Sequence, residues 1–339
     1  MKRIYGIIST LAALLLITAC TADSPETAQQ PQQLKLSAAL NSESGQTRTV
    51  TSGLQTTQLD DANTVGAFVY RKGQTASQVV DGEDYGYTNK QFTPVSGVTT
   101  LYSPSQPIFP YKGTGDQLKV DVYAYAPYDA TWTTLTGAKT FSVKADQKKK
   151  ANYIASDLLW ATPHGGEAPD SNPYKNLILQ FAHKLTQIYV EISAGDGVTT
   201  SQLEGATVSL NGVVLTGTIN LQDGTLTPSA STGSVSMLKC AYDEDDNAIP
   251  STDANYADYF KGSAIVYPIA TLPTTATLTI TKGTTTYTAQ LKTTSVTSWV
   301  SGNKYKYSVR VSTDGISVAA TIKPWVDAPP RTGNAELPN

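Results

Sequence analysis

The stretch LKLSAAL at residues 34–40 alternates apolar side chains with polar or small ones. Its apolar face consists of Leu34, Leu36, Ala38 and Leu40. An alternation with a period of two is typical of a β-strand that buries one face. We therefore expect this segment to be a half-buried strand at the start of the folded body.

A basic residue follows this strand after a short polar run, because residues 41–47 lead directly to Arg48. A protease that cuts between Arg48 and Thr49 would separate the strand, and everything before it, from the remaining body. The sheet would then lose a strand and expose a groove whose unpaired backbone groups can pair with a foreign strand. Alternatively, Arg48 is a solvated arginine of an ordinary loop.

The residues before the strand have the form of an export signal and a tether. Lys2 and Arg3 precede the apolar run 11–17, and Cys20 follows a short run of small residues, as in a lipobox. Residues 1–19 are therefore expected to be a lipoprotein signal peptide, and Cys20 to become a lipidated N-terminus with diacylglycerol and palmitate-type chains in the outer membrane. Residues 20–33 are polar and Gln-rich, which predicts a flexible tether.

Composition points to an exported all-β protein and excludes several other classes. The 339 residues carry a formal net charge of −3, with 16% charged residues, so no basic face for nucleic acid is expected. There are 2 cysteines, and lipidation of Cys20 leaves only Cys240, which excludes an intrachain disulfide. Thr, Ser and Gly are abundant, and 19 Tyr stand against 6 Phe, which favours strands.

Strand patterns continue along the chain and predict two tandem β-sandwich domains. Strands are expected at residues 64–70, 118–125, 140–143, 177–192 (with a bulge near His183), 206–210, 212–221, 233–238, 263–269, 276–281, 284–291, 304–311 and 316–322. The Gly- and Pro-rich loop at 164–173 predicts a domain boundary. The expected division is a first part at 20–48 that proteolysis removes, an N-terminal sandwich at 49–172, a C-terminal sandwich at 173–327 and a polar tail at 328–339.

No set of residues converges on catalysis, so an enzyme is not expected. The two histidines, His164 and His183, lie on segments of different character. We expect His183 to be a hydrogen-bonded histidine of a sheet and not a metal ligand. The scattered carboxylates leave a glycoside-hydrolase pair open. The acidic run at 243–246 lacks the spacing and the glycine of an EF-hand, so no metal or cofactor is expected.

Several stretches together resemble the fimbrillin family, that is, the FimA-type or type V pilins and their Mfa-like relatives. They are the lipobox at Cys20, TRT at 47–49, PIFP at 107–110, VDVYAYAPY at 120–128, DLL at 157–159, FAHKL at 181–185 and YKYSVRVSTDGISVAATIKPW at 305–325. Their order extends over nearly the whole chain.

The resemblance implies two transthyretin-like β-sandwich domains, export as an outer-membrane lipoprotein, and a final place in a fimbrium on the cell surface that serves adhesion or biofilm formation. It also implies that an arginine-specific protease cuts after Arg48, and that the subunits then assemble with other fimbrial subunits by strand exchange. The partners are therefore other subunits, the protease and, before cleavage, the membrane. In this scheme Leu34, Leu36, Ala38 and Leu40 plug the groove until cleavage.

The C-terminus departs from the family pattern, because residues 326–339 contain two adjacent prolines and little alternation. One alternative is that the donor strand is the segment 316–326, with Ile316, Val318, Ala320 and Ile322 on its apolar face. Another is that the protein is a tip or accessory subunit, which accepts a strand and donates none. A third is a permanently anchored lipoprotein that binds glycans or host ligands through exposed aromatic residues, with Trp132, Trp160 and Tyr123 as candidates.

Overall fold

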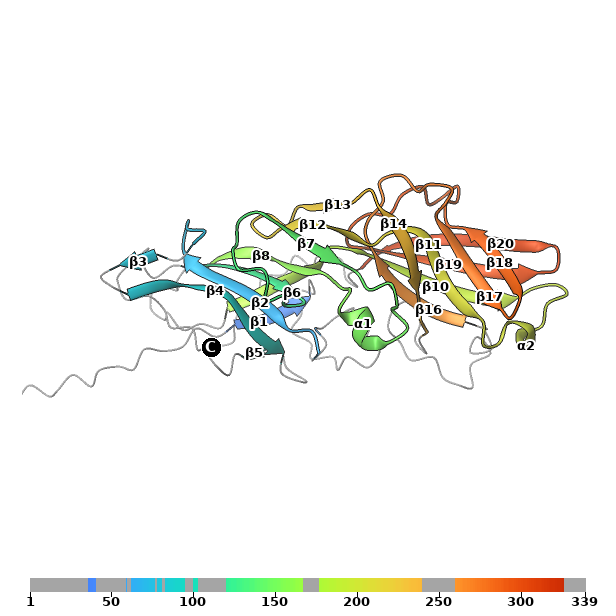
Figure 1. The fold of residues 1–339 in the computed structure, drawn as a ribbon, viewed down its shortest axis with the longest axis horizontal. Helices are drawn as coiled ribbons and strands as arrows, with labels where there is room; N and C mark the ends of the chain where they lie inside the picture. Colours follow the sequence, from blue (N-terminus) through green and yellow to red (C-terminus); the bar gives the residue numbers. More distant parts are fainter. Residues whose placement is uncertain are drawn as a thin grey trace, which may run out of the picture.

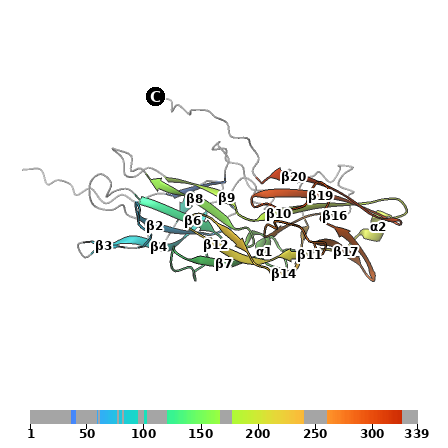
Figure 2. The ribbon, with the colours of Figure 1, turned by 90° about the horizontal axis from the view of Figure 1, so that it is seen from above.

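A computed structural model of the chain shows an elongated molecule, with the earlier strands at one end and the later strands at the other (Figures 1 and 2). It describes residues 36–40, 59, 62–76, 78–80, 83–94, 100–102, 120–166, 177–239 and 260–325. The regular structure of these residues is almost entirely strand, so the prediction of an all-β fold is confirmed. No helix among them is long and apolar enough to cross a membrane.

The earlier strands form one sheet that closes on itself. They are β1 (Leu36–Leu40), β2 (Val65–Arg71), β3 (Gln78–Val80), β4 (Glu83–Pro94), β5 (Thr100–Tyr102), β6 (Val120–Ala126), β8 (Leu159–Gly166) and β9 (Leu177–His183). The order in this 8-stranded sheet is β2-β6-β8-β9-β1-β5-β4-β3, and β2 also pairs with β4. This extra pairing joins the two sides of the sheet into a barrel, which leaves only β3 as an extension. We call this part the barrel; it stands where we expected the first sandwich.

Alternating side chains from the barrel strands fill its interior. The core contains Leu36, Ala38, Leu40, Leu59, Val65, Ala67, Val69, Phe92, Val120, Val122, Ala124, Ala126, Leu159, Ala161, Leu179 and Phe181. The alternation is plain in β6, where Val120, Val122 and Ala124 are buried while Asp121 and Tyr123 are half-buried. Closure of the sheet pairs the backbone groups that an open sheet would leave at its edges.

The later strands form a two-layer sandwich, as expected for the second half. They are β10 (Thr186–Ala194), β11 (Thr207–Val214), β14 (Thr232–Ser236), β15 (Leu238–Lys239), β16 (Phe260–Val266), β17 (Thr277–Lys282), β18 (Thr285–Gln290), β19 (Asn303–Ser312) and β20 (Gly315–Pro324), with the short helix α2 (Thr200–Leu203). One layer has the order β15-β16-β10-β19-β20 and the other β14-β11-β17-β18. Their facing apolar side chains, Trp299 and Tyr307 among them, form the core of the sandwich.

A third, small sheet connects the two halves. It consists of β7 (Ala138–Ser142), β12 (Thr216–Asn220) and β13 (Leu226–Pro228), and the short helix α1 (Lys150–Ile154) lies nearby. Strand β7 belongs to the earlier part of the chain, yet it pairs with β12 over five residue pairs, from Thr216↔Ser142 to Asn220↔Ala138. The two halves are thus joined by strand pairing as well as by the covalent chain.

The change from barrel to sandwich occurs between β9 and β10, where only Lys184 and Leu185 intervene. The segment 177–192, expected as one strand with a bulge near His183, is therefore two strands that belong to different sheets. The predicted boundary between residues 172 and 173 lies outside the described residues. By sheet membership β9 goes with the first half, because it pairs with β8 and β1.

Glycine at position 212 is required by a bulge in β11. The pairing of β11 with β14 shifts register between Asn211 and Val213, and Gly212 has φ +66°. A Cβ atom there would collide with the backbone of Thr275. Gly283, in the turn between the paired strands β17 and β18, has φ +57° but open space around its Cβ position. The two glycines share a left-handed backbone and differ in packing.

We expect Gly212→Ala to destabilise the protein more than Gly283→Ala. A left-handed alanine alone costs about 1 kcal/mol, which is the expected loss at Gly283. At Gly212 the backbone collision adds to this cost, so the loss should exceed about 2 kcal/mol. Urea-induced unfolding of the two variants measures the difference. Equal losses would show that Thr275 does not constrain Gly212.

Candidate functional site at the buried first strand

Strand β1 is a central strand of the barrel although it comes first in the described chain. It pairs in parallel with β9 from Leu36↔Leu177 to Leu40↔Phe181, and antiparallel with β5 through Leu36↔Leu101 and Ser37↔Thr100. Figure 1 shows it among strands that come much later in the sequence. Without β1, both β9 and β5 would have an unpaired backbone edge inside an otherwise closed sheet.

The side chains of β1 form part of the barrel core. Leu36, Ala38 and Leu40 have exposed fractions of 1%, 7% and 2%, and all three contact the interior cluster. Of the residues expected to plug a groove, these three lie on the buried face, and Leu34 lies outside the described residues. On its buried face, the place that β1 occupies accepts a large, a small and a large side chain at alternate residues. We call this place, between β5 and β9, the β1 slot.

The proposed C-terminal donor residues lie on β20, the edge strand of the five-stranded layer. This strand pairs with β19 along its whole length, from Ser312↔Gly315 to Asn303↔Pro324. Ile316, Val318 and Ala320 are partly buried against the sandwich core, whereas Ile322 is 49% exposed. The apolar face of β20 is therefore less deeply buried than that of β1.

The processing residues Cys20, Arg48 and Thr49 lie outside the described residues. By its position in the sequence, Arg48 falls in the connection between Leu40, where β1 ends, and Val65, where β2 begins. The chain between these two strands is the only covalent link of β1 to the rest of the barrel.

The contact region between barrel and sandwich was not anticipated from the sequence, and we call it the joint. Its buried apolar residues are Phe68, Tyr70, Tyr125, Trp132, Leu135, Val143, Tyr153, Leu158, Trp160, Leu185, Val214, Ile219, Leu221, Ile265, Tyr267 and Trp325. These residues come from both halves, so the joint is a third core rather than a flexible hinge. The signal that could have found it is the set of aromatic residues that lie near the ends of strands.

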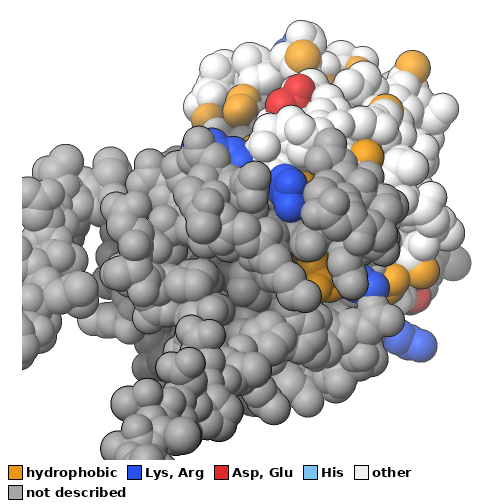
Figure 3. Space-filling model, turned by 90° about the vertical axis from the view of Figure 1, so that its left-hand side faces the viewer, with side chains coloured by type: hydrophobic (Ala, Val, Ile, Leu, Met, Phe, Trp, Pro, Cys, Tyr) orange, Lys and Arg blue, Asp and Glu red, His pale blue; other side chains and the backbone are white. Residues whose placement is uncertain are grey.

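Aromatic residues suggested for glycan binding are used in this joint instead. Trp132 and Trp160 are 5% and 9% exposed, so neither offers a free ring face. The Trp160 indole donates a hydrogen bond to the carbonyl oxygen of Leu221 (2.9 Å), and the Lys184 ammonium lies 5.1 Å from its ring. Tyr123 is half-buried. At the barrel end, the described surface mixes apolar, basic and acidic side chains and shows no large patch of one kind (Figure 3).

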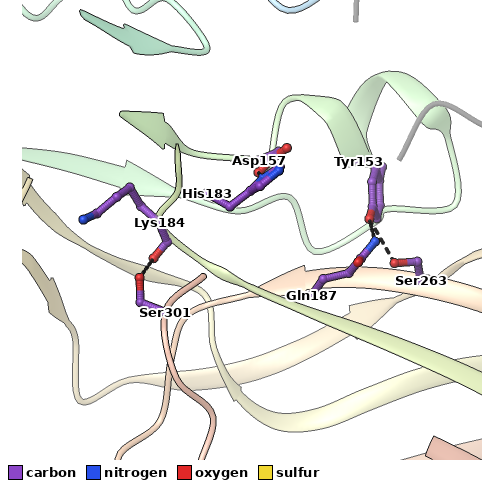
Figure 4. Close-up of polar contacts among 7 residues, drawn as sticks. All are labelled: Tyr153, Asp157, His183, Lys184, Gln187, Ser263 and Ser301. Carbon is purple, nitrogen blue, oxygen red and sulfur yellow. Dashed lines mark hydrogen bonds and ion pairs between the residues drawn. The ribbon is translucent and has the colours of Figure 1, made fainter. Parts of the chain in front are cut away.

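Buried polar groups fix how the two halves meet (Figure 4). The Tyr153 hydroxyl on α1 accepts a hydrogen bond from Gln187 Nε2 (2.7 Å) and lies 2.9 Å from the Ser263 hydroxyl. Gln147 pairs with the backbone of Ile265 on β16, donating to its oxygen (2.7 Å) and accepting from its nitrogen (2.8 Å). Such groups are costly to separate in an apolar surrounding, so they hold one relative orientation.

His183, Asp157 and Trp325 meet at the end of β9. His183 Nδ1 lies 2.9 Å from Asp157 Oδ1, and the two side chains are 3% and 0% exposed. The Trp325 indole stacks on the His183 ring with 3.9 Å between the ring centroids and 5° between the planes. His183 is thus a hydrogen-bonded histidine of the sheet, as expected. The three residues come from three of the sequence stretches, at 157–159, 181–185 and 305–325, that carry the family resemblance.

Burial and hydrogen bonds both shift pKa values in and beside the joint. Desolvation lowers the pKa of the Lys184 ammonium, and the carboxylate of Asp223 opposes this shift. Hydrogen bonds from the Thr225 backbone and hydroxyl lower the pKa of Asp223 itself. Burial raises the pKa of Tyr267, whose hydroxyl donates to the oxygen of Phe141 (2.8 Å). Among the described residues, no group of three or more His, Cys, Asp or Glu side chains is arranged to hold a metal ion.

Comparisons with known proteins identify similar folds. A sequence model of a family described as fimbrillin-like matches residues 47–325. A structure described as a cell adhesion protein from Bacteroides uniformis is 20% identical with a TM-score of 0.63, and the match covers 87% of this chain and 99% of that one. One from Bacteroides ovatus, described in the same way, is 19% identical with a TM-score of 0.60, covering 88% and 99%. No curated protein matches the sequence.

We expect Leu40→Ala to weaken the barrel strongly. Leu40 is 2% exposed in the core, so truncation should cost about 3 kcal/mol through the lost contacts and the cavity. Ile178 on the adjoining strand β9 is 47% exposed, and Ile178→Ala should cost less than about 0.5 kcal/mol. Urea-induced unfolding compares the two variants. A Leu40→Ala variant as stable as the control would mean that β1 contributes nothing to the barrel core.

Proposed function

The chain belongs to the fimbrillin-like family, and from this premise we propose that it is a structural subunit of a cell-surface fimbrium that assembles with other subunits by exchange of β-strands. The observation that carries this proposal is the β1 slot. A short strand at the start of the chain occupies a central, fully buried place in a sheet. Its covalent attachment to the barrel runs only through the connection that contains Arg48.

Export and anchoring precede assembly in this proposal. The lipobox that ends at Cys20 supports an outer-membrane lipoprotein precursor, and residues 20–33 supply a polar tether between lipid and barrel. While β1 fills the slot, no other strand can enter this slot, and the precursor stays a monomer. Cleavage by an arginine-specific protease between Arg48 and Thr49 leaves β1 held by non-covalent contacts alone.

The size of those contacts makes exchange feasible. Burial of the two leucines of β1 contributes about 3–6 kcal/mol in total, an upper estimate. The backbone hydrogen bonds of β1 with β9 and β5 can be reproduced by any incoming strand of the same direction. A partner strand with a similar side-chain pattern can therefore replace β1 at little net cost.

A matching pattern occurs in β20. Residues 318–322 read VAATI and residues 36–40 read LSAAL, so both have an alanine between small neighbours and two aliphatic residues. These are the two places in the sequence where an alanine, flanked by Gly, Ala, Ser or Thr, stands two residues from Val, Ile or Leu on both sides. This match supports a donor in which Val318, Ala320 and Ile322 take the places of Leu36, Ala38 and Leu40. Residues 326–339 contain no such pattern.

Arg48→Ala tests the processing step. The wild-type protein sheared from cells should begin at Thr49 and form a ladder of oligomers, whereas Arg48→Ala should keep its lipidated Cys20 and remain monomeric. Arg48→Lys is the matched variant, because it preserves the charge and removes the arginine that the protease requires. Intact mass and N-terminal sequencing give the result.

Strand exchange is wrong for this protein if wild type and variants all begin at lipidated Cys20 and none of them polymerises. A permanently anchored lipoprotein that binds glycans or host ligands would then be the function to test.

A disulfide between β19 and β20 tests the donor. Ser308 and Ala319 are exposed and face each other in the register, so cysteines there fall within the range that a disulfide bridges. In a Cys240→Ser background, Ser308→Cys with Ala319→Cys should abolish oligomers until a reductant is added, because β20 cannot leave its sheet.

The matched control is a disulfide in the β17–β18 hairpin, made by Thr281→Cys with Thr286→Cys. These two residues also face each other in a strand pair, and the disulfide leaves β20 free. This variant should polymerise like the wild type. Unchanged oligomers with the β19–β20 disulfide would rule out β20 as the donor and assign this role to residues 326–339 or to another subunit.

A further inference from the structure

We propose that Trp325 is a latch that fastens the end of β20 to the barrel half of the molecule, so that β20 can leave its sheet only when the joint opens. The latch consists of Trp325, His183 and Asp157. It is a property of the single chain, and its consequence for assembly rests on the proposed function.

Strand β20 itself is weakly embedded in the sandwich. It is an edge strand, and Gly315, Ser317, Ala319 and Thr321 on its outer face are exposed. Its inner face is only partly buried, and Ile322 at the end of that face is 49% exposed. Of the side chains described from Gly315 to Trp325, Trp325 is the one that is fully buried, with an exposed fraction of 0%. The other attachments of the segment are the hydrogen bonds to β19, one hydrogen bond from the Ser295 hydroxyl to the Ala320 oxygen (3.4 Å) and the partly buried inner face, so Trp325 is its most deeply buried attachment.

The Trp325 side chain packs on the barrel half, and its backbone is bonded to Gly302, which precedes β19 and is itself bonded to the chain link between the halves. Its indole stacks on His183 at the end of β9, and His183 is oriented by Asp157, which precedes β8. The Trp325 backbone nitrogen donates to the oxygen of Gly302 (2.9 Å), and the Gly302 nitrogen donates to the oxygen of Leu185 (2.8 Å). The end of a sandwich strand is thus seated in the joint.

Two buried nitrogen atoms of the latch lower the free-energy cost of opening it. His183 Nε2 and Trp325 Nε1 are buried and have no hydrogen-bond partner among the described residues. An unsatisfied buried polar group carries a desolvation penalty. When Trp325 leaves, both nitrogen atoms reach water, which offsets part of the lost stacking and apolar burial. The arrangement therefore keeps β20 in place while limiting the cost of its release.

This geometry couples the withdrawal of β20 to the loosening of the joint. Withdrawal of β20 removes Trp325 from the joint core and exposes His183, so the contact between barrel and sandwich must loosen. Conversely, an intact joint holds β20 and prevents it from acting as a donor strand. In an assembling fibre, donation of β20 would therefore be accompanied by loosening of the joint, where the barrel meets the sandwich.

Amide hydrogen exchange of the uncleaved monomer tests the latch. In Trp325→Ala, exchange should accelerate by about 10-fold or more in residues 315–322 and in the joint segments around Asp157 and His183, because the local opening free energy falls. Strands β4 and β17 should change less than about 2-fold, since their buried residues belong to the barrel core and the sandwich core and not to the joint. Trp325→Phe should give an intermediate acceleration in the same segments, because a phenyl ring still stacks on His183.

Ile322→Ala is the matched control on the same strand, and exchange of the joint segments should stay as in the wild type because Ile322 is 49% exposed. A uniform acceleration over all strands would make Trp325 an ordinary core residue and overturn the proposal. Acceleration of the joint without β20, or of β20 without the joint, would overturn it as well. If Trp325→Ala does not fold, the Trp325→Phe pattern decides. The monomer is used throughout, so the result does not depend on whether strand exchange occurs.

Discussion

The backbone pairing of β1 is the constraint on which the rest of the structure depends. A closed sheet leaves no edge, but it also cannot lose an internal strand without exposing the donors and acceptors of both neighbours. In this protein the internal strand that comes first in the described chain is also the one with a single covalent attachment to the barrel. The same five residues therefore complete the core and are joined to the rest of the barrel through one connection.

The connection between β9 and β10 transmits this constraint to the other half of the molecule. Strand β9 forms one wall of the β1 slot, and two residues later the chain is already in the sandwich. These two residues are tied on both sides, since the Lys184 nitrogen donates to the Leu158 oxygen (2.9 Å) and the Leu185 oxygen accepts from Gly302 (2.8 Å). This link and the joint core around it hold the barrel and the sandwich in contact, so the two halves form one elongated unit and are not joined by a flexible linker.

Local patterns predicted many of the strands but not which strands pair with one another. The strands expected at 64–70 and 304–311 are found within one residue as β2 and β19, and the buried face of β1 is the expected one. Alternation shows which face is apolar, but pairing between β2 and β4 or between β7 and β12 depends on distant segments. The apolar run at 177–192 concealed a change of sheet, because apolar residues occur in both of its strands. Trp132 and Trp160 were considered as exposed aromatic residues, and only the packing of the two halves shows that they lie in the joint.

The central claim is that the β1 slot holds residues 36–40 before assembly and a strand of another subunit afterwards. Electron cryomicroscopy of assembled fibres tests this most directly, because the side chains in the slot can be identified from the density. The account predicts the pattern of Val318, Ala320 and Ile322 from a neighbouring subunit between β5 and β9, with no density for residues 36–40. Density for Leu36, Ala38 and Leu40 of the same chain in the slot of every fibre subunit would contradict it.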